Sequence, residues 1–138
     1  KTSAYGEIYL LSFKMFLDNP VTGIGINNFK FLCENNKSYQ NKMVHYDCAS
    51  HPHNIYIQWL TEGGLIVFVL FITYLIFFIS FIKNNSGEKK YKIISIAIIV
   101  IMFWPIMSTG SLIKNWYGVS TFFIIGLIMC LSKFRNNF

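Results

Sequence analysis

Three long stretches without a charged residue constrain the fold of this chain more than any other feature. They are Gly64–Ile82, Ile93–Ile113 and, with a more polar start, Asn115–Ser132. Each is close to the length that a helix needs to cross about 30 Å of hydrocarbon. None alternates apolar and polar residues as a barrel strand would. A short chain cannot bury three helices that are apolar on all sides, so the sequence predicts an all-α membrane protein.

The distribution of charge indicates the orientation of these spans. Charged residues are only 13% of the chain, about half their usual share, which excludes an ordinary soluble enzyme core. The net charge of +6 comes wholly from residues 64–138, and its lysines flank the apolar stretches. Because basic loops stay in the cytoplasm, we place loop 83–92 and the C-terminus inside. A nucleic-acid partner is not expected, since the positive charge forms no basic face.

The chain is therefore expected to have two parts. Residues 1–56 form an outer loop region with an interfacial helix, and the rest is transmembrane, with helices at about 57–82, 93–108 and 115–132. Because the chain begins with Lys1 rather than Met, we expect it to be a piece of a larger protein.

Pro105 lies inside the second apolar stretch. A proline there removes a helix hydrogen bond, so the helix should end near Met107. The polar residues that follow, Ser108 to Ser111, predict either a re-entrant or interfacial segment or a simple loop.

The outer region opens with a short apolar helix and a turn. Ile8–Leu17 is too short to span a membrane, and Asp18-Asn19-Pro20 should end it. It could be an interfacial helix or the tail of a span. Gly23 and Gly25 form a G-x-G pair without the rest of a phosphate-binding loop, which favours a backbone role with positive φ.

Two cysteines, Cys33 and Cys48, also lie in the outer region. An oxidising compartment favours their pairing. A disulfide across this loop would stabilise the fold by roughly 3 kcal/mol.

The sharpest local pattern is His51-Pro52-His53-Asn54, just before the first span. If a helix starts there, Asn54, Gln58 and Glu62 share one polar stripe. Glu62 would lie near the hydrocarbon boundary, where an acid must face protein or water. A solvated interfacial Glu62 is the alternative.

A metal site is one further interpretation of this stretch. His45, Cys48, His51 and His53 are four potential ligands within nine residues. Their spacing fits no common zinc pattern, and Cys48 has a better partner in Cys33. We therefore expect neither a metal nor a cofactor.

The pattern resembles the signature of the bacterial O-antigen ligase and O-antigen polymerase family. His53-Asn54, nine residues and Gly64 match the family's motif, while Val67 departs from its last position. FKMFLDNPVTGIGINNF is similar to the family's upstream Pro-x-x-Gly-x-Gly segment, through Pro20, Gly23 and Gly25. The resemblance covers residues 3 to 82 well.

The resemblance implies a metal-independent glycosyltransferase of the bacterial inner membrane. It also implies that this chain is the C-terminal part of such an enzyme and inactive alone, because members of the family usually have many more spans than three. Such enzymes take a glycan from undecaprenyl diphosphate at the periplasmic face; the ligase transfers it to lipid A–core, the polymerase to another lipid-linked repeat unit. His53 matches the family's catalytic histidine, which suits a base that accepts the acceptor hydroxyl's proton. His51, Asn54 and Glu62 are the accompanying candidates for substrate binding.

One family position differs here. The family usually carries an Arg about fifteen residues before the Pro, where this chain has Tyr5. Lys14 and Lys30 are possible substitutes as point charges for the diphosphate. Otherwise the phosphate-binding Arg lies outside this chain.

Two other classes of protein remain as alternatives. A non-catalytic transport or flippase module would bind substrate through the histidines, but it predicts more intramembrane charges than Glu62 alone. A structural anchor with a metal-bound outer loop would lose its outer fold on chelation.

Overall fold

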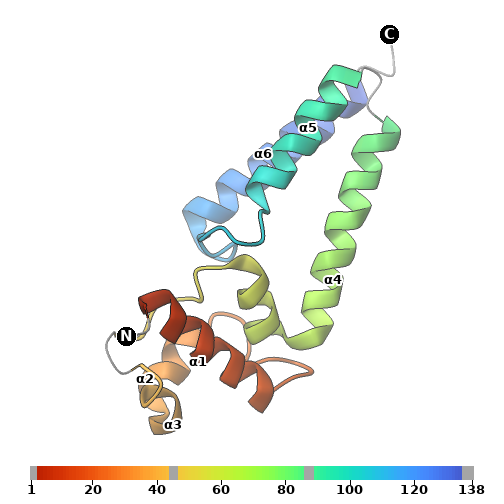
Figure 1. The fold of residues 1–138 in the computed structure, drawn as a ribbon. Helices are drawn as coiled ribbons and strands as arrows, with labels where there is room; N and C mark the ends of the chain where they lie inside the picture. The colour runs from red at the N-terminus through yellow and green to blue at the C-terminus, as the bar shows by residue number, and fades with distance from the viewer. Residues whose placement is uncertain (1–2, 44–46, 86–88, 135–138) are drawn as a thin grey trace. The chain divides into compact units, whose positions relative to one another are not determined.

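The computed structural model describes residues 3–43, 47–85 and 89–134, and within these ranges the chain is helical without strands. The all-α prediction is thus confirmed. The helices, shown in Figure 1, are α1 (Ala4–Asp18), α2 (Phe29–Asn35), α3 (Lys37–Gln40), α4 (Ile55–Asn85), α5 (Lys89–Met102) and α6 (Asn115–Phe134). They divide into two compact units, residues 1–71 with 108–111 and residues 72–107 with 112–138. We call these the outer unit and the helical unit.

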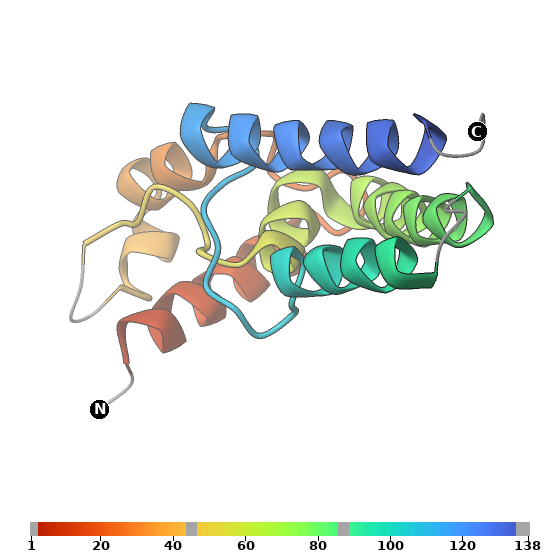
Figure 2. The same cartoon turned by 90° about the horizontal axis from the view of Figure 1, so that it is seen from above.

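Helix α1 provides one wall of the outer unit's core. Its N-terminus is capped by Ser3, whose hydroxyl accepts a hydrogen bond from the Gly6 amide at 3.2 Å. The helix ends at Asp18, as the following Asn19-Pro20 predicts. One face is buried against α2 and α3, which lie beside α1 in both views (Figures 1 and 2). This core consists of Ile8, Leu11, Met15, Phe29, Cys33 and Tyr39.

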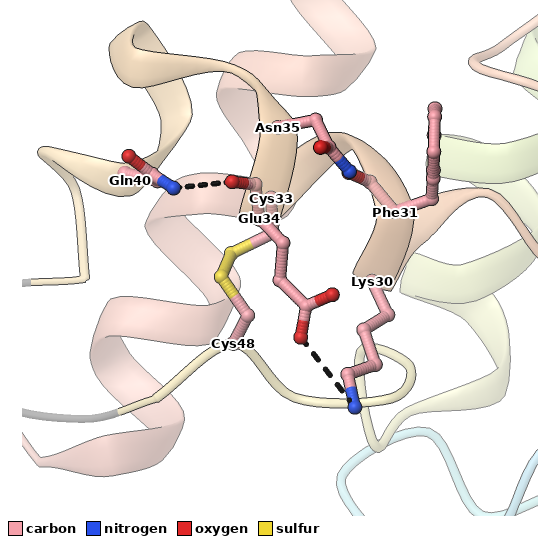
Figure 3. The surroundings of a disulfide bond; sticks show 7 residues. All are labelled: Lys30, Phe31, Cys33, Glu34, Asn35, Gln40 and Cys48. Atoms are coloured by element: carbon pink, nitrogen blue, oxygen red, sulfur yellow. Dashed lines mark hydrogen bonds and ion pairs between the residues drawn. A yellow bond between two sulfur atoms is a disulfide. The ribbon is translucent and has the colours of Figure 1, made fainter.

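A disulfide ties the end of this core to the loop before α4. Cys33 and Cys48 are joined, with 5.8 Å between their Cα atoms (Figure 3). Beside them Gln40 donates a hydrogen bond to the backbone carbonyl of Glu34. The bridge fixes the segment that leads into the two histidines.

Helix α4 is interrupted at Gly64, where φ is 65° and ψ is −168°. The loop at Pro20–Gly25 fills the interruption. The amides of Leu65 and Ile66 donate to the carbonyls of Pro20 and Val21 at 2.9 and 3.3 Å. In return the amides of Ile24 and Gly25 donate to the carbonyls of Thr61 and Glu62, both at 3.0 Å. The loop therefore supplies the backbone partners that a continuous helix would supply itself.

This exchange explains two of the glycines in the sequence pattern. Gly23 and Gly64 both have positive φ, at 68° and 65°. A Cβ on Gly23 would collide with the Glu62 backbone, and a Cβ on Gly64 would collide with the Val21 carbonyl. Each glycine allows the loop and the helix to approach, which is the backbone role that the sequence predicts.

The helical unit contains two antiparallel helices, α5 and α6, which pack against each other (Figure 1). Helix α5 ends at Met102, not near Met107 as predicted. The physical reason is that Pro105 also disfavours helical geometry at Trp104, so the helix stops before both residues. No helix covers residues 103–114, which favours the simple-loop interpretation of this segment.

By length and apolar content, α4 is suited to cross a membrane. Beyond Gly64 its residues 65–85 extend about 31 Å, at 1.5 Å per residue. Helix α6 contains a shorter apolar stretch, Trp116–Cys130. That α4, α5 and α6 cross a membrane therefore stays a prediction.

Candidate active site

The two histidines lie in a tight turn that leads into α4. His53 has a left-handed backbone, with φ of 57°. This conformation costs a residue with a side chain about 1–2 kcal/mol. Asn54 then caps the helix, because its Oδ1 accepts hydrogen bonds from the amides of Tyr56 and Ile57 at 3.0 and 3.1 Å. The turn brings the rings of His51 and His53 to a centroid distance of 4.3 Å.

The ring of His51 is held on both sides. Its Nδ1 lies 2.9 Å from the hydroxyl of Ser50, and its Nε2 lies 3.3 Å from the carbonyl oxygen of Thr109. A carbonyl only accepts, so Nε2 carries a proton and donates it to Thr109. In the neutral ring Nδ1 then accepts from Ser50. His51 is buried and both of its ring nitrogens have partners; its part in substrate binding stays a prediction.

His53 differs in its ring contacts. The side chain is half-buried, and its ring nitrogens make no hydrogen bond within residues 3–43, 47–85 and 89–134. The Tyr5 ring lies edge-on to it at a centroid distance of 5.9 Å. Tyr5 is itself 48% exposed. Of the two rings, that of His53 is thus the one without a hydrogen bond to the described residues.

The polar stripe predicted on α4 is present and buried. Asn54, Gln58 and Glu62 are 5%, 3% and 1% exposed. Gln58 Nε2 donates to Glu62 Oε2 at 2.9 Å. Glu62 Oε1 is buried and has no hydrogen-bond partner in the described part of the chain. An unsatisfied carboxylate oxygen costs free energy in the absence of a ligand or water. Glu62 therefore faces protein rather than solvent.

The predicted phosphate-binding lysines both have carboxylate partners on their own helices. Lys14 Nζ lies 3.2 Å from Asp18 Oδ2, and Lys30 Nζ lies 3.5 Å from Glu34 Oε1 (Figure 3). These pairs are solvent-exposed and contribute little stability. Neither lysine makes a hydrogen bond or ion pair with His53 in the described part of the chain, and their role at the diphosphate stays a prediction.

Asp18 also accepts a hydrogen bond from the hydroxyl of Tyr39, at 2.9 Å. This bond, with help from Lys14, lowers the pKa of the Asp18 carboxyl. Burial and the same hydrogen bond raise the pKa of Tyr39 to about 12. The pair links the end of α1 to α3 and is a structural contact of the outer unit.

No group of three or more His, Cys, Asp or Glu side chains is arranged to hold a metal ion within the described ranges. His45, one of the four potential ligands, lies outside the described residues. Cys48 is joined to Cys33 and His51 to Ser50 and Thr109.

The fold and the site define a class of protein. The described residues are helical without strands and include one helix suited to cross a membrane, with a buried polar site that contains histidine where this helix begins. The family model described as O-antigen ligase matches residues 1–72 of the 138 residues. The chain therefore belongs to the O-antigen ligase family, which confirms the resemblance drawn from the sequence. No curated protein and no solved structure matches it.

Two features of the site were missed by the sequence analysis. One is the contact of Tyr5 with His53, across 48 residues of chain. The other is the pairing of Thr109 and Ser111 with the histidine turn and α4. The only available signal was the polar run after Pro105, which is unusual inside an apolar stretch.

Proposed function

We propose that the chain carries the acceptor-activating site of a glycosyltransferase that uses a lipid-linked glycan. The donor is a glycan on undecaprenyl diphosphate, and the acceptor is lipid A–core. The observation that supports this most directly is the difference between the two histidines: His51 is engaged at both nitrogens, while the ring of His53 makes no hydrogen bond among the described residues.

In this proposal His53 is the general base. Its neutral imidazole takes the proton of the acceptor hydroxyl as the oxygen attacks the anomeric carbon. The bond from that carbon to the diphosphate breaks, and the diphosphate leaves with its electron pair. No metal or cofactor takes part in the proposed reaction.

Other predicted residues act around this base. Glu62 offers a buried oxygen without a partner, which suits a hydroxyl donor on the sugar. Asn54 and His51 hold the turn through the cap and the Thr109 contact. Lys14 or Lys30 would bind the diphosphate only after leaving its present carboxylate partner.

The same proposal includes a position in the membrane. The protein is placed in the bacterial inner membrane, with α4, α5 and α6 as its transmembrane helices. Residues 1–56 lie on the periplasmic side, and loop 83–92 and the C-terminus lie in the cytoplasm. The basic residues around α5 and after α6 support this orientation.

The test compares His53→Ala with His51→Ala in the full-length protein. Each variant is expressed in a strain that lacks the native copy, and the cell-surface polysaccharide is separated on a gel. We expect His53→Ala to reach the membrane at normal levels and to lose the long-chain ladder, a fall of at least about 100-fold in transfer. An unchanged ladder would reject His53 as the base and favour the transport module.

The position of the block distinguishes the two transfer reactions. Long chains that accumulate on the lipid carrier indicate a ligase. Single repeat units on the core indicate a polymerase, which joins lipid-linked repeat units to each other. Both outcomes keep His53 as the base and change only the acceptor.

A further inference from the structure

The loop between α5 and α6 contributes residues to the outer unit, although it lies more than fifty residues from the histidines in the sequence. Figure 2 shows this loop, in light blue, passing beside the turn that leads into α4. The amide of Thr109 donates to the carbonyl of His53 at 2.8 Å. The carbonyl of Thr109 accepts from His51 Nε2 at 3.3 Å. One residue of the loop thus binds both histidines.

Ser111 anchors the same loop to α4. Gln58 Nε2 donates to Ser111 Oγ at 2.8 Å and to Glu62 Oε2 at 2.9 Å. Ser111, Gln58 and Glu62 are all at least 97% buried. Water therefore does not compete for these bonds, and losing one partner leaves a buried polar group without a replacement.

The His53 turn depends on such support. A left-handed residue with a side chain relaxes to an ordinary backbone unless its surroundings hold it. The bond from Thr109 fixes the carbonyl of that residue, and a rotated backbone would aim the imidazole elsewhere. A general base is effective only within hydrogen-bond reach of its substrate proton.

We propose that Thr109 and Ser111 are positioning residues that hold the His53 turn in its active geometry. Both residues lie outside the region that the family model covers, residues 1–72. The inference rests on the proposed function, because it needs His53 to be the base. It adds a segment beyond the matched region to the active site.

The expected kinetic effect is specific. A displaced base slows proton removal in the transition state but leaves the sugar and lipid contacts in place. The turnover rate kcat should therefore fall while KM stays nearly constant. A general loss of folding would instead lower the amount of active enzyme and its thermal stability.

The experiment compares Ser111→Ala with Ser111→Thr and Ser108→Ala in the full-length protein, reconstituted with an undecaprenyl diphosphate-linked glycan and its acceptor. Ser108 is exposed in the same loop, so Ser108→Ala is a matched control. We expect Ser111→Ala to lower kcat about tenfold, the effect of one lost buried hydrogen bond. Ser111→Thr keeps the hydroxyl and should retain most of the wild-type kcat. Ser108→Ala should have the kcat of the wild type.

Other outcomes overturn the inference. They are a wild-type kcat in Ser111→Ala, an equal loss in Ser108→Ala, or a rise in KM at constant kcat. If Ser111→Ala does not accumulate, Ser111→Cys, which keeps a side chain of similar size but accepts a hydrogen bond only weakly, is judged by the same criteria. His53→Ala is measured in parallel: an active His53→Ala rejects the proposed function, whereas an inactive one with a fully active Ser111→Ala rejects only this inference.

Discussion

The outer unit and the helical unit are stabilised in different ways. The outer unit buries polar groups and pairs them: Gln58, Ser111 and Thr109 all make specific hydrogen bonds there. In the helical unit, α6 instead exposes large apolar side chains, among them Trp116 at 90% and Phe123 at 70%. An apolar surface of this kind needs lipid or protein around it. The outer unit also exposes apolar side chains, among them Leu10 and Phe31, but close backbone contacts and buried hydrogen bonds hold its loop against α4.

The strongest test of this difference substitutes one glycine by alanine in each unit and compares the losses of stability. Gly64→Ala places a Cβ against the Val21 carbonyl at a residue with positive φ. We expect it to destabilise the outer unit by at least about 3 kcal/mol, because both the clash and the backbone strain must be relieved. Thermal unfolding of the purified full-length protein, with the amount in the membrane, measures the effect.

Gly126→Ala is the matched control in the helical unit. A Cβ on Gly126 would meet nothing within 4 Å, and the residue lies within α6. We expect a neutral or slightly stabilising effect, up to about 1 kcal/mol, since alanine is the better helix former. Equal losses from both substitutions would contradict the distinction between the units.

The disulfide offers the second test. Cys33→Ser opens the bridge whose cysteines are 15 residues apart. Loss of the cross-link should lower the free energy of unfolding by roughly 3 kcal/mol. The matched substitution Cys130→Ser changes an exposed free cysteine of α6 and should have little effect. The measurement is thermal unfolding with and without a reducing agent, and a reducing agent should destabilise only proteins that retain the bridge.

The smallest expected effect is at the Tyr39–Asp18 hydrogen bond. Tyr39→Phe should cost roughly 0.5–1 kcal/mol, because Asp18 is solvent-exposed. The effect should depend on pH at both ends of the range. The pKa of Tyr39 is raised from 10.0 to about 12. The contribution of protonated Tyr39 to the free energy of unfolding is therefore complete below pH 10 and is lost as the pH rises towards 12.

At acid pH the titration of Asp18 determines whether stability rises or falls with pH. Its carboxyl pKa lies below the ordinary value of 3.8, so its contribution is present above that pH and is lost as the pH falls below it. The stability difference between wild type and Tyr39→Phe should therefore be constant from about pH 5 to pH 9. A difference that varies within that range would contradict the assignment.

The sequence predicted those features whose physical causes are local. Asn19-Pro20 ends α1, the Asn54–Glu62 stripe follows helical spacing, and Gly23 has the positive φ expected of it. The contacts of Thr109 and Ser111 could not be predicted, because they join residues more than fifty positions apart without any periodic signal. Helix α5 ended early because Pro105 acts on its predecessor as well as on itself.

The interruption of α4 has a consequence for the nine residues between Asn54 and Gly64. From Asn54 to Gly64 the helix advances ten positions, or roughly 2.8 turns. Both ends are anchored: Asn54 caps the helix, and Gly64 meets the Pro20–Gly25 loop. Inserting one residue between them would rotate the histidine turn by about 100° relative to that loop. The number of residues between Asn54 and Gly64 therefore determines the direction in which the turn with His53 faces relative to the Pro20–Gly25 loop.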